Sequence, residues 1–210
     1  MLIVFIGPQG SGKGTQAQKL TKYGFKHVSM GQALRDRAKQ GDDTAQEIKD
    51  YVNNGRLVPP RLTRQAAKKE LEENENILFD GYPRTKEQAH SLEDLANIDH
   101  VIHIDISEEE SIHRIQKRRV CTATGETYSI DRITEEDKKK CQEQGGKIVR
   151  RKDDTPQKVK KRLRDYHKKT EPLLQYYEEK GVDVIHVQGE GTPSEVHKEI
   201  CQKLGIKHRT

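Results

Sequence analysis

A glycine-rich segment near the N-terminus carries residue types that can bind phosphate. Residues 7–15 read Gly-Pro-Gln-Gly-Ser-Gly-Lys-Gly-Thr, directly after an apolar run at 2–6 and before a helical pattern over 16–23. Glycines lack Cβ, so backbone N–H groups can converge on phosphate oxygens, and the N-terminus of the following helix adds positive potential. Lys13 adds a full positive charge. The segment therefore predicts a phosphate-binding loop.

The hydroxyl of this loop is displaced from its usual position. Gly14 follows Lys13, and Thr15 comes one residue later. The general pattern places Ser or Thr directly after the lysine, where its hydroxyl ligates Mg²⁺. The departure argues against direct Mg²⁺ ligation by a loop hydroxyl. A glycine-rich turn without a ligand is the alternative, but strand, spaced glycines, lysine and helix coincide here.

A second polar segment follows another apolar run. Residues 80–85 read Asp-Gly-Tyr-Pro-Arg-Thr, after the run at 77–79. Ligands of α/β sheets bind at the carboxyl ends of the strands, where Asp80 would stand. Arg84 can bind phosphate, and Gln88 follows one helical turn later. An Asp that caps a turn and an Arg in a surface pair are alternatives, but the nearby phosphate loop favours a functional role.

Arginines gather around a later segment of the chain. A guanidinium group is planar and donates several hydrogen bonds at once, which suits phosphate. We expect Asp153 and Asp154 to orient these arginines, whereas Arg119 and Arg150 can equally be ordinary surface residues. We expect Arg114, Arg118 and Arg119 on a helix that leads into this segment. The arginines of this set that are candidates for a functional role are Arg114, Arg118, Arg151 and Arg162.

Composition limits the kinds of protein that these motifs can belong to. A chain of 210 residues fits one α/β domain with small insertions. The formal net charge of +5 would attract nucleotides, nucleic acid or acidic lipid alike. No run approaches the ~18 apolar residues of a membrane span, and residues 2–6 lack the features of a signal peptide. We expect a cytoplasmic protein without a membrane partner.

The apolar runs predict a parallel sheet. They lie at 2–6, 27–29, 77–79, 101–106 and 182–187, and helical patterns separate them. A helix is expected over 156–179, kinked or interrupted by Pro172. Another starts at Thr192, with Pro193 in its first turn and Glu195 completing a capping box. Residues 30–59 and 118–155 do not fit the alternation and are interpreted as insertions over the site.

Together these motifs resemble the adenylate kinase family over nearly the whole chain. Gly-Lys-Gly-Thr-Gln-Ala-Gln at 12–18 and Asp-Gly-Tyr-Pro-Arg at 80–84 carry the resemblance, and segments 28–35 and 55–59 align with the acceptor-binding parts of the family. The resemblance implies an α/β fold like that of P-loop nucleoside triphosphate hydrolases, a five-stranded parallel sheet flanked by helices. It implies a core at 1–29, 60–117 and 156–210, a small helical nucleoside monophosphate-binding insertion at 30–59, and a lid at 118–155.

The resemblance also implies an activity and a role for each motif residue. The activity is reversible phosphoryl transfer from ATP to AMP, giving two ADP, by electrostatic positioning with Mg²⁺, which Asp80 would hold through water. The catalytic residues would be Lys13, Arg84, Arg118, Arg151 and Arg162. ATP would be bound by Gly10, Ser11, Gly12, Lys13, Gly14, Thr15, Arg114, Arg118, Thr127, Tyr128 and Gly191. AMP would be bound by Met30, Arg35, Arg56, Leu57, Val58, Gly81, Tyr82, Pro83, Arg84, Gln88, Arg151 and Arg162.

Two residues depart from the family pattern on the acceptor side. Met30 stands where a Thr is typical, and Gln32 where an Asp is common. Methionine can pack against a base but cannot donate a hydroxyl hydrogen bond. Gln88 favours AMP as acceptor, while another monophosphate or a small hydroxyl metabolite stays open. A catalytically silent nucleotide or nucleic-acid binder is a further alternative, against which the matched arginines argue. We expect a monomer with no nucleic-acid partner.

The cysteines are few and odd in number, which does not suggest a secreted disulfide framework. By the resemblance, Cys121-x-x-Thr124 and Cys141-x-x-Gln144 lie where relatives carry four zinc ligands or a polar quartet. Zinc prefers four Cys or His ligands, so a polar network is favoured over zinc. A disulfide stays open if the sulfurs meet, although a reducing cytoplasm argues against one. Cys201 is expected to be buried on a helix.

Overall fold

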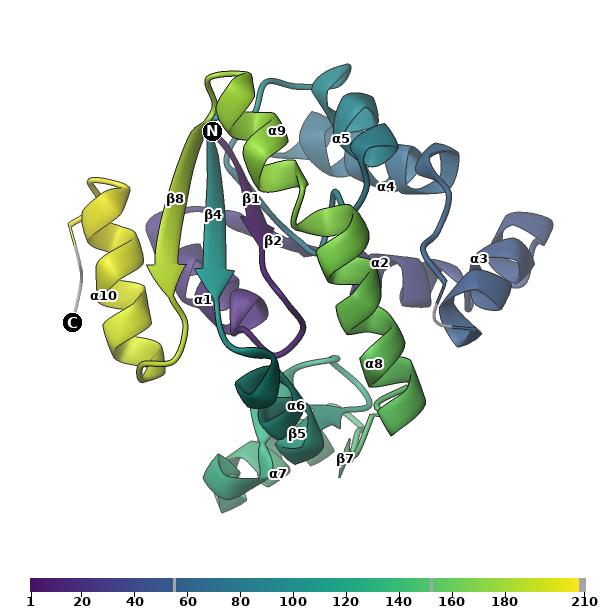
Figure 1. Cartoon of the computed structure of the whole chain (residues 1–210). Helices are drawn as coiled ribbons and strands as arrows, with labels where there is room; N and C mark the ends of the chain where they lie inside the picture. Colours follow the sequence, from purple (N-terminus) through teal and green to yellow (C-terminus); the bar gives the residue numbers. More distant parts are fainter. Residues whose placement is uncertain (55, 152, 208–210) are drawn as a thin grey trace.

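The computed structural model describes residues 1–54, 56–151 and 153–207 (Figure 1). Gly55 and Lys152, which belong to two of the aligned motifs, lie outside the described residues. The central sheet has five parallel strands in the order β2-β3-β1-β4-β8. Their bounds are β1 (Leu2–Ile6), β2 (Lys26–Ser29), β3 (Ile77–Asp80), β4 (His100–Asp105) and β8 (Asp183–Gln188). The predicted five-stranded α/β fold is confirmed.

Helices cover both faces of this sheet, so the side chains of its central strand alternate between two apolar clusters. Val4 of β1 packs on one face with residues of α4, α5 and α9. Phe5 points to the opposite face, among residues of α1 and α10. Burial on both faces explains why the strands are continuous apolar runs. The helix bounds are α1 (Lys13–Leu20), α4 (Pro60–Glu73), α5 (Lys86–Glu93), α9 (Leu173–Glu179) and α10 (Pro193–Lys203).

Two predictions about helices, the capping box at Thr192 and the interruption at Pro172, can be compared with the structure. The capping box of α10 is confirmed, because Thr192 Oγ1 accepts from Glu195 N and Glu195 Oε2 accepts from Thr192 N at 2.8 Å. The long helix changes before Pro172 rather than at it: α8 (Pro156–Asp165) passes into a π-helical turn (Tyr166–Thr170). Proline lacks an N–H and clashes with the carbonyl of the preceding turn. The wider turn, in which Glu171 N donates to Tyr166 O, comes directly before it.

Two groups of elements stand outside the central sheet. The first contains α2 (Met30–Arg37) and α3 (Asp43–Asn53). The second follows α6 (Glu108–Lys117) and contains α7 (Glu135–Glu143) and a small antiparallel sheet in the order β6-β5-β7, with β5 (Arg118–Cys121), β6 (Thr127–Ser129) and β7 (Ile148–Val149). Short 3₁₀ turns span Thr21–Tyr23 and Ile130–Arg132. Figure 1 shows the arrowheads of β4 and β8 directed toward the side that carries α6, β5 and α7.

The prediction that Arg118 and Arg119 lie on a helix is wrong. The α6 helix ends at Lys117, and Arg118 has extended dihedral angles, φ −65° and ψ 134°. It pairs with Ser129 of β6. Sheet pairing between residues distant in sequence overrides the helical propensity of arginine.

A disulfide joins Cys121 of β5 to Cys141 of α7. This is the alternative that the sequence left open. The polar network favoured from the sequence is not what links the two halves: Thr124 Oγ1 instead accepts from Glu126 N within its own turn. Cys201 is buried on α10, as expected.

The disulfide is important for the stability of residues 118–155 because this segment contains little apolar core. Among the described residues from 118 to 155, only Cys121, Cys141, Gly146 and Asp154 are buried. Elsewhere, each face of the central sheet is covered by a cluster of buried aliphatic and aromatic side chains. The stability of this segment therefore depends on the covalent link.

Breaking the disulfide is expected to loosen this segment alone. The two cysteines are 20 residues apart. For a closed loop of about this length, chain entropy predicts that losing the disulfide lowers the free energy of unfolding by about 3 kcal/mol. Reductant should therefore speed hydrogen exchange in α7 and leave β1 amides unchanged. The Cys121→Ser/Cys141→Ser variant should behave like the reduced protein and show no further response to reductant. Equal α7 exchange in reduced and oxidised protein would contradict this expectation.

Within the part of the chain that the structure describes, no helix is long and apolar enough to cross a membrane.

Candidate active site

The loop between β1 and α1 surrounds the ammonium group of Lys13. Its Nζ donates to Gly7 O at 2.8 Å, to Pro8 O at 2.7 Å and to Ser11 Oγ at 3.2 Å. Gly12, just before α1, has φ 98°, a left-handed conformation that favours glycine. The sequence therefore wraps the loop around the lysine and directs the N-terminus of α1 toward the same space. Such a helix end attracts anions.

The surroundings of Lys13 disfavour its protonated, charged form. Burial lowers the pKa of the Lys13 ammonium to about 8, and the guanidinium groups of Arg84 and Arg118 act in the same direction. Asp80 opposes them. An arriving phosphate would supply the negative charge that this site lacks. The site is therefore suited to an anionic ligand.

Asp80 ends β3 beside this loop. Its Oδ2 lies 3.3 Å from where a Cβ on Gly14 would stand, so the glycine lets the carboxylate approach the start of α1. The same oxygen is 3.8 Å from Nε2 of His27. Burial by itself raises the pKa of Asp80, but His27 and the charge of Lys13 outweigh it and hold the pKa below its usual value. Asp80 is therefore an anion among cations.

Asp154 holds two of the predicted arginines. Its side chain is fully buried and accepts from Arg118 Nε at 2.8 Å and from Arg118 Nη2 at 2.5 Å. Arg162 of α8 reaches it at 3.3 Å through Nη1. Arg118 comes from β5 and Arg162 from α8, so one carboxylate ties the small sheet to the long helix. This confirms that Asp154 orients arginines.

Asp153 does the same for a second pair. Arg151 donates to its carboxylate through Nε at 2.5 Å and through Nη2 at 2.8 Å, and Arg162 contacts it closely. Burial alone raises the pKa of Asp153, but the charges of Arg151 and Arg162 outweigh this and hold its pKa well below the usual range. Asp153 is therefore ionised at neutral pH.

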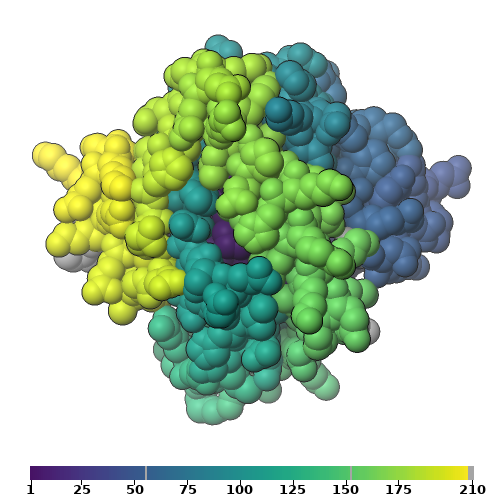
Figure 2. Space-filling view, viewed as in Figure 1, coloured from purple at the N-terminus to yellow at the C-terminus, as the bar shows by residue number. Residues whose placement is uncertain are grey.

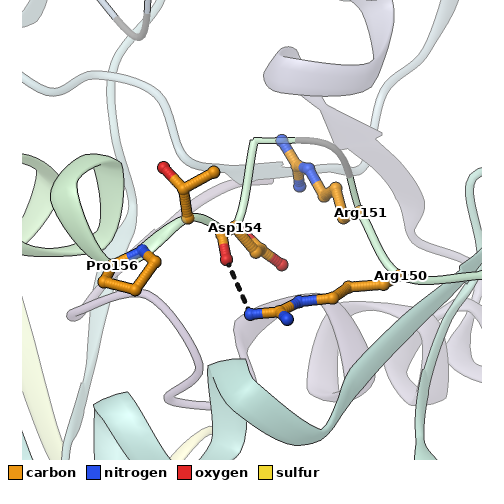
Figure 3. A pocket seen from close by; sticks show the side chains of 5 residues that line it. Arg150, Arg151, Asp154 and Pro156 are labelled. Atoms are coloured by element: carbon orange, nitrogen blue, oxygen red, sulfur yellow. Dashed lines mark hydrogen bonds between the residues drawn. The ribbon is translucent and has the colours of Figure 1, made fainter.

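A pocket of about 280 Å³ opens at this cluster, lined by Arg150, Arg151, Asp154, Thr155 and Pro156. Figure 3 shows Arg150 and Arg151 across from Pro156, with Asp154 between them and the hydrogen bond from Arg150 Nη2 to Asp154 O drawn as a dashed line. Figure 2 shows the purple N-terminal atoms recessed among the teal, green and yellow surfaces. Strand β1 (Leu2–Ile6) is buried at every residue, while Met1 before it is half-exposed.

Arg35 brings α2 to the same cluster. Burial lowers its pKa to about 10, and the nearby positive charge of Arg151 acts in the same direction. Arg35 donates to Gln32 Oε1 through Nη2 at 2.7 Å. Because Arg35 lies on α2 and Arg151 follows β7, the two groups of elements outside the central sheet come close to each other here.

Gln88 links the segment after β3 to the end of the first insertion. Its Oε1 accepts from Arg84 N at 2.8 Å, and its Nε2 donates to Val58 O at 2.9 Å. Arg84 Nε donates to Gly81 O at 2.7 Å, and the peptide bond between Tyr82 and Pro83 is cis. Among the described residues each half of this buried amide makes one hydrogen bond, and each can make one more.

Other predicted residues lie around the phosphate loop. Arg114 Nη1 approaches Gly10 O at 3.4 Å. Gly191 directly precedes the cap of α10, and Gln16 of α1 reaches that cap through a hydrogen bond from Nε2 to Pro193 O at 3.0 Å. Thr15 is exposed at the start of α1. These positions place the predicted donor side around one helix.

Some predicted residues make contacts of another kind. The Arg56 guanidinium lies 4.7 Å from the ring centre of Tyr51. Tyr128 on β6 donates its hydroxyl to Glu126, and Thr127 beside it is exposed. Leu57 is half-buried. None of these contacts joins the arginine cluster.

Met30 is buried in the apolar cluster under α2, with only 2% of its surface exposed. It therefore provides an apolar wall without a hydroxyl.

Sequence reasoning missed His27. It lies on the same face of the sheet as Asp80, because Ser29 pairs with Asp80 and His27 is two residues before Ser29. The parallel register, had it been known, would have revealed this pair.

Comparisons with known proteins agree with this geometry. A family model described as adenylate kinase matches residues 5–182. The chain is 36% identical to an adenylate kinase of Petrotoga mobilis, over 97% of each chain. It is 37% identical to one of Clostridium tetani, over 98% of this chain and 99% of the other. It is 35% identical to one of Archaeoglobus fulgidus, over 95% and 96%.

Proposed function

The chain belongs to the adenylate kinase family, and from this premise we propose how its residues support reversible phosphoryl transfer from ATP to AMP, giving two ADP. The observation that carries the proposal is the meeting of Lys13, Asp80 and the arginine cluster at one place. The protein is a nucleoside monophosphate kinase. Its reaction needs two anions aligned and the charge between them neutralised, with no covalent intermediate.

On the donor side, the phosphate loop binds ATP. Backbone N–H groups of residues 10–15 and the N-terminus of α1 face the phosphates. Lys13 leaves its carbonyl partners and follows the transferring group. Arg114 stacks on the adenine, Arg118 neutralises the phosphates, and Thr127, Tyr128 and Gly191 border the base. An arginine plane suits both stacking and phosphate binding.

On the acceptor side, arginines bind the phosphate of AMP. Arg35 of the acceptor-binding insertion and Arg84 of the core bind this phosphate from two sides. Arg151 and Arg162 neutralise the charge on the oxygens of the transferring and acceptor phosphates. Gln88 reads the base with its remaining N–H and lone pair. The walls come from Met30, Arg56, Leu57, Val58 and the segment 81–83. A monophosphate has a second pKa near ~6, so it is already deprotonated at neutral pH and needs no general base.

The residues present fit Mg²⁺ that arrives with the nucleotide. Within the described ranges no group of three His, Cys, Asp or Glu side chains could hold a metal, but Mg²⁺ keeps several waters and needs only one or two carboxylates beside the phosphates. Asp80 is an ionised carboxylate at the edge of the phosphate loop and would hold the ion through water. When bound, Mg²⁺ neutralises charge on the phosphates.

The division into domains is part of the proposal. The strands of the central sheet come from residues 1–29, 60–117 and 156–210, while α2 and α3 fill 30–59 and the small sheet fills 118–155. We assign these parts as core, acceptor-binding insertion and lid. Closure of the lid would exclude water, which otherwise competes as acceptor.

We further propose a cytoplasmic monomer that has neither membrane nor nucleic acid as a partner. The positive net charge then serves the anionic substrates rather than a polyanion. The disulfide between Cys121 and Cys141 would have to withstand the reductants of this compartment.

A substrate panel tests the reaction. ATP is offered with AMP, CMP, UMP, GMP and dAMP in a coupled assay, and kcat/KM for AMP is expected to exceed that of the pyrimidine monophosphates by at least about 10-fold, since a buried amide that reads one base rejects others. Absence of transfer to every acceptor would contradict the proposal. A higher value for another base would favour a different monophosphate, which the missing hydroxyl at Met30 keeps as the second candidate.

A further inference from the structure

The side chain of Gln32 lies between the acceptor insertion and the lid. On its own helix, Oε1 accepts from Arg35 Nη2 at 2.7 Å and from Arg35 Nε at 3.2 Å, while Nε2 donates to Asp36 Oδ2 at 3.0 Å. The amide is therefore held on both sides, and its oxygen receives one edge of the guanidinium. This fixes the direction in which Arg35 presents its other edge.

On the lid side, the same amide faces Gly125. A Cβ added to Gly125 would stand 2.5 Å from Gln32 Oε1 and 2.8 Å from Cδ. Gly125 has φ +75° and lies in the turn between β5 and β6, where its N–H donates to Cys121 O at 2.8 Å. The turn between β5 and β6, called the lid turn below, therefore contacts the amide that hydrogen-bonds to Arg35.

The neutral character of Gln32 has a consequence for Arg35. A carboxylate at position 32 would compensate the charge of Arg35, whereas an amide oxygen orients the guanidinium and leaves its positive charge for a ligand. Asp36, the acid next to Arg35 in sequence, is exposed and paired with Lys39 at 2.7 Å. Asp153 and Asp36 offset this charge only in part, because burial and Arg151 outweigh them and lower the pKa of Arg35, so an acceptor phosphate would supply the missing negative charge.

We propose that Gln32 is a positioning residue that couples closure of the lid to the aiming of Arg35 at the acceptor phosphate. With the lid turn seated on it, the amide has one position, and Arg35 is fixed with it. When the lid turn withdraws, the amide regains freedom and Arg35 loses its alignment. The inference rests on the proposed function, in which Arg35 binds the phosphate of AMP.

The lid offers a matched pair of glycines for the test. Gly125→Ala inserts a methyl group where Gln32 stands. Gly145→Ala makes the same substitution at φ +77°, with nothing within 4 Å of the new Cβ. The two glycines have similar positive φ angles, and only the methyl group added at Gly125 would displace the amide. Gly125→Ala should raise KM for AMP about 10-fold, the size expected when a hydrogen bond to a charged group is lost, with KM for ATP changed less than about 2-fold.

A double-substitution cycle then identifies the amide as the link. Gln32→Ala should raise KM for AMP by a similar factor, and adding Gly125→Ala to it should produce little further change, because the two act through one contact. Gly145→Ala should match the wild type apart from stability. Independent, multiplying effects of Gln32→Ala and Gly125→Ala would overturn the inference, as would equal KM values for the two glycine variants.

Hydrogen exchange separates this inference from the proposed function. Gln32→Ala should speed exchange of the Gly125 N–H, whichever nucleotide the protein uses, because the turn loses the side chain on which it rests. Unchanged exchange would overturn the coupling even in an active kinase. Absence of phosphoryl transfer in the wild type, with exchange responding as expected, would overturn the proposed function and leave the contact standing.

Discussion

Replacing Lys13 with alanine is expected to lower kcat by about 10²–10³-fold, the usual cost of removing one preorganised donor from a site of developing charge. The ammonium is held by two carbonyl oxygens and a hydroxyl of its own loop, so it is already within reach of a phosphate bound there. Its charge is needed most when the phosphoryl group is between donor and acceptor. The loss should therefore fall on kcat more than on KM for ATP, measured in steady-state assays.

The matched control is Lys19→Ala, a lysine in the last turn of the same helix. It removes an equal charge and a similar helix former without touching the loop. The rate of the Lys19→Ala variant should stay within about 2-fold of the wild type. Similar losses in the two variants would show that net charge, rather than the position of Lys13, supports the reaction.

The same lysine gives a pH dependence with a definite sign. Since the pKa of Lys13 is lowered to about 8 by burial, the free protein loses this charge as the pH rises through 8. Binding of the triphosphate raises the pKa of Lys13 again, so at higher pH the binding of ATP is coupled to the uptake of a proton by Lys13. The affinity for ATP, measured by calorimetry, should therefore fall above about pH 8 in the wild type. The Lys13→Ala variant should lack this fall.

Elements with strong local signals could be predicted from the sequence. The strands are apolar because both faces of the sheet are covered, so each one appears as a continuous run. The cap of α10 needs only Thr192, Pro193 and Glu195, which are neighbours in the chain. The phosphate loop is also local, since its glycines, its lysine and its flanking elements form one stretch. Such features depend on residues that the sequence already places side by side.

Features that depend on distant partners could not be read in this way. Arg118 was expected on a helix because its pairing with Ser129 is invisible before the small sheet forms. The disulfide requires Cys121 and Cys141 to meet through the packing of α7 on β5. The contact of Gln32 with Gly125 likewise exists only because two insertions close over the same site. In each case tertiary geometry decides what local propensity leaves open.

Replacing Asp154 with alanine is expected to cost about 3–5 kcal/mol of stability and to lower kcat by about 10²-fold or more. Its carboxylate is fully buried and pairs with Arg118 and Arg162. Without it, the largely buried guanidinium of Arg118 loses its bidentate partner, and both arginines lose the geometry that would direct them at the phosphates. Unfolding by denaturant measures the first effect, and single-turnover transfer measures the second.

Asp131→Ala is the control that separates a buried pair from an exposed one. Asp131 also lies within residues 118–155 and pairs with Lys117 at 2.5 Å, but more than half of its side chain is exposed. Exposed pairs contribute about 0–1 kcal/mol, so its loss should change neither stability nor rate appreciably. Asp154→Asn should keep the shape and part of the hydrogen bonding, and should fall between Asp154→Ala and the wild type in rate. If Asp154→Ala were no more harmful than Asp131→Ala, the arginines would be aligned by the substrates alone, and the carboxylates beneath them would have no part in preorganising the site.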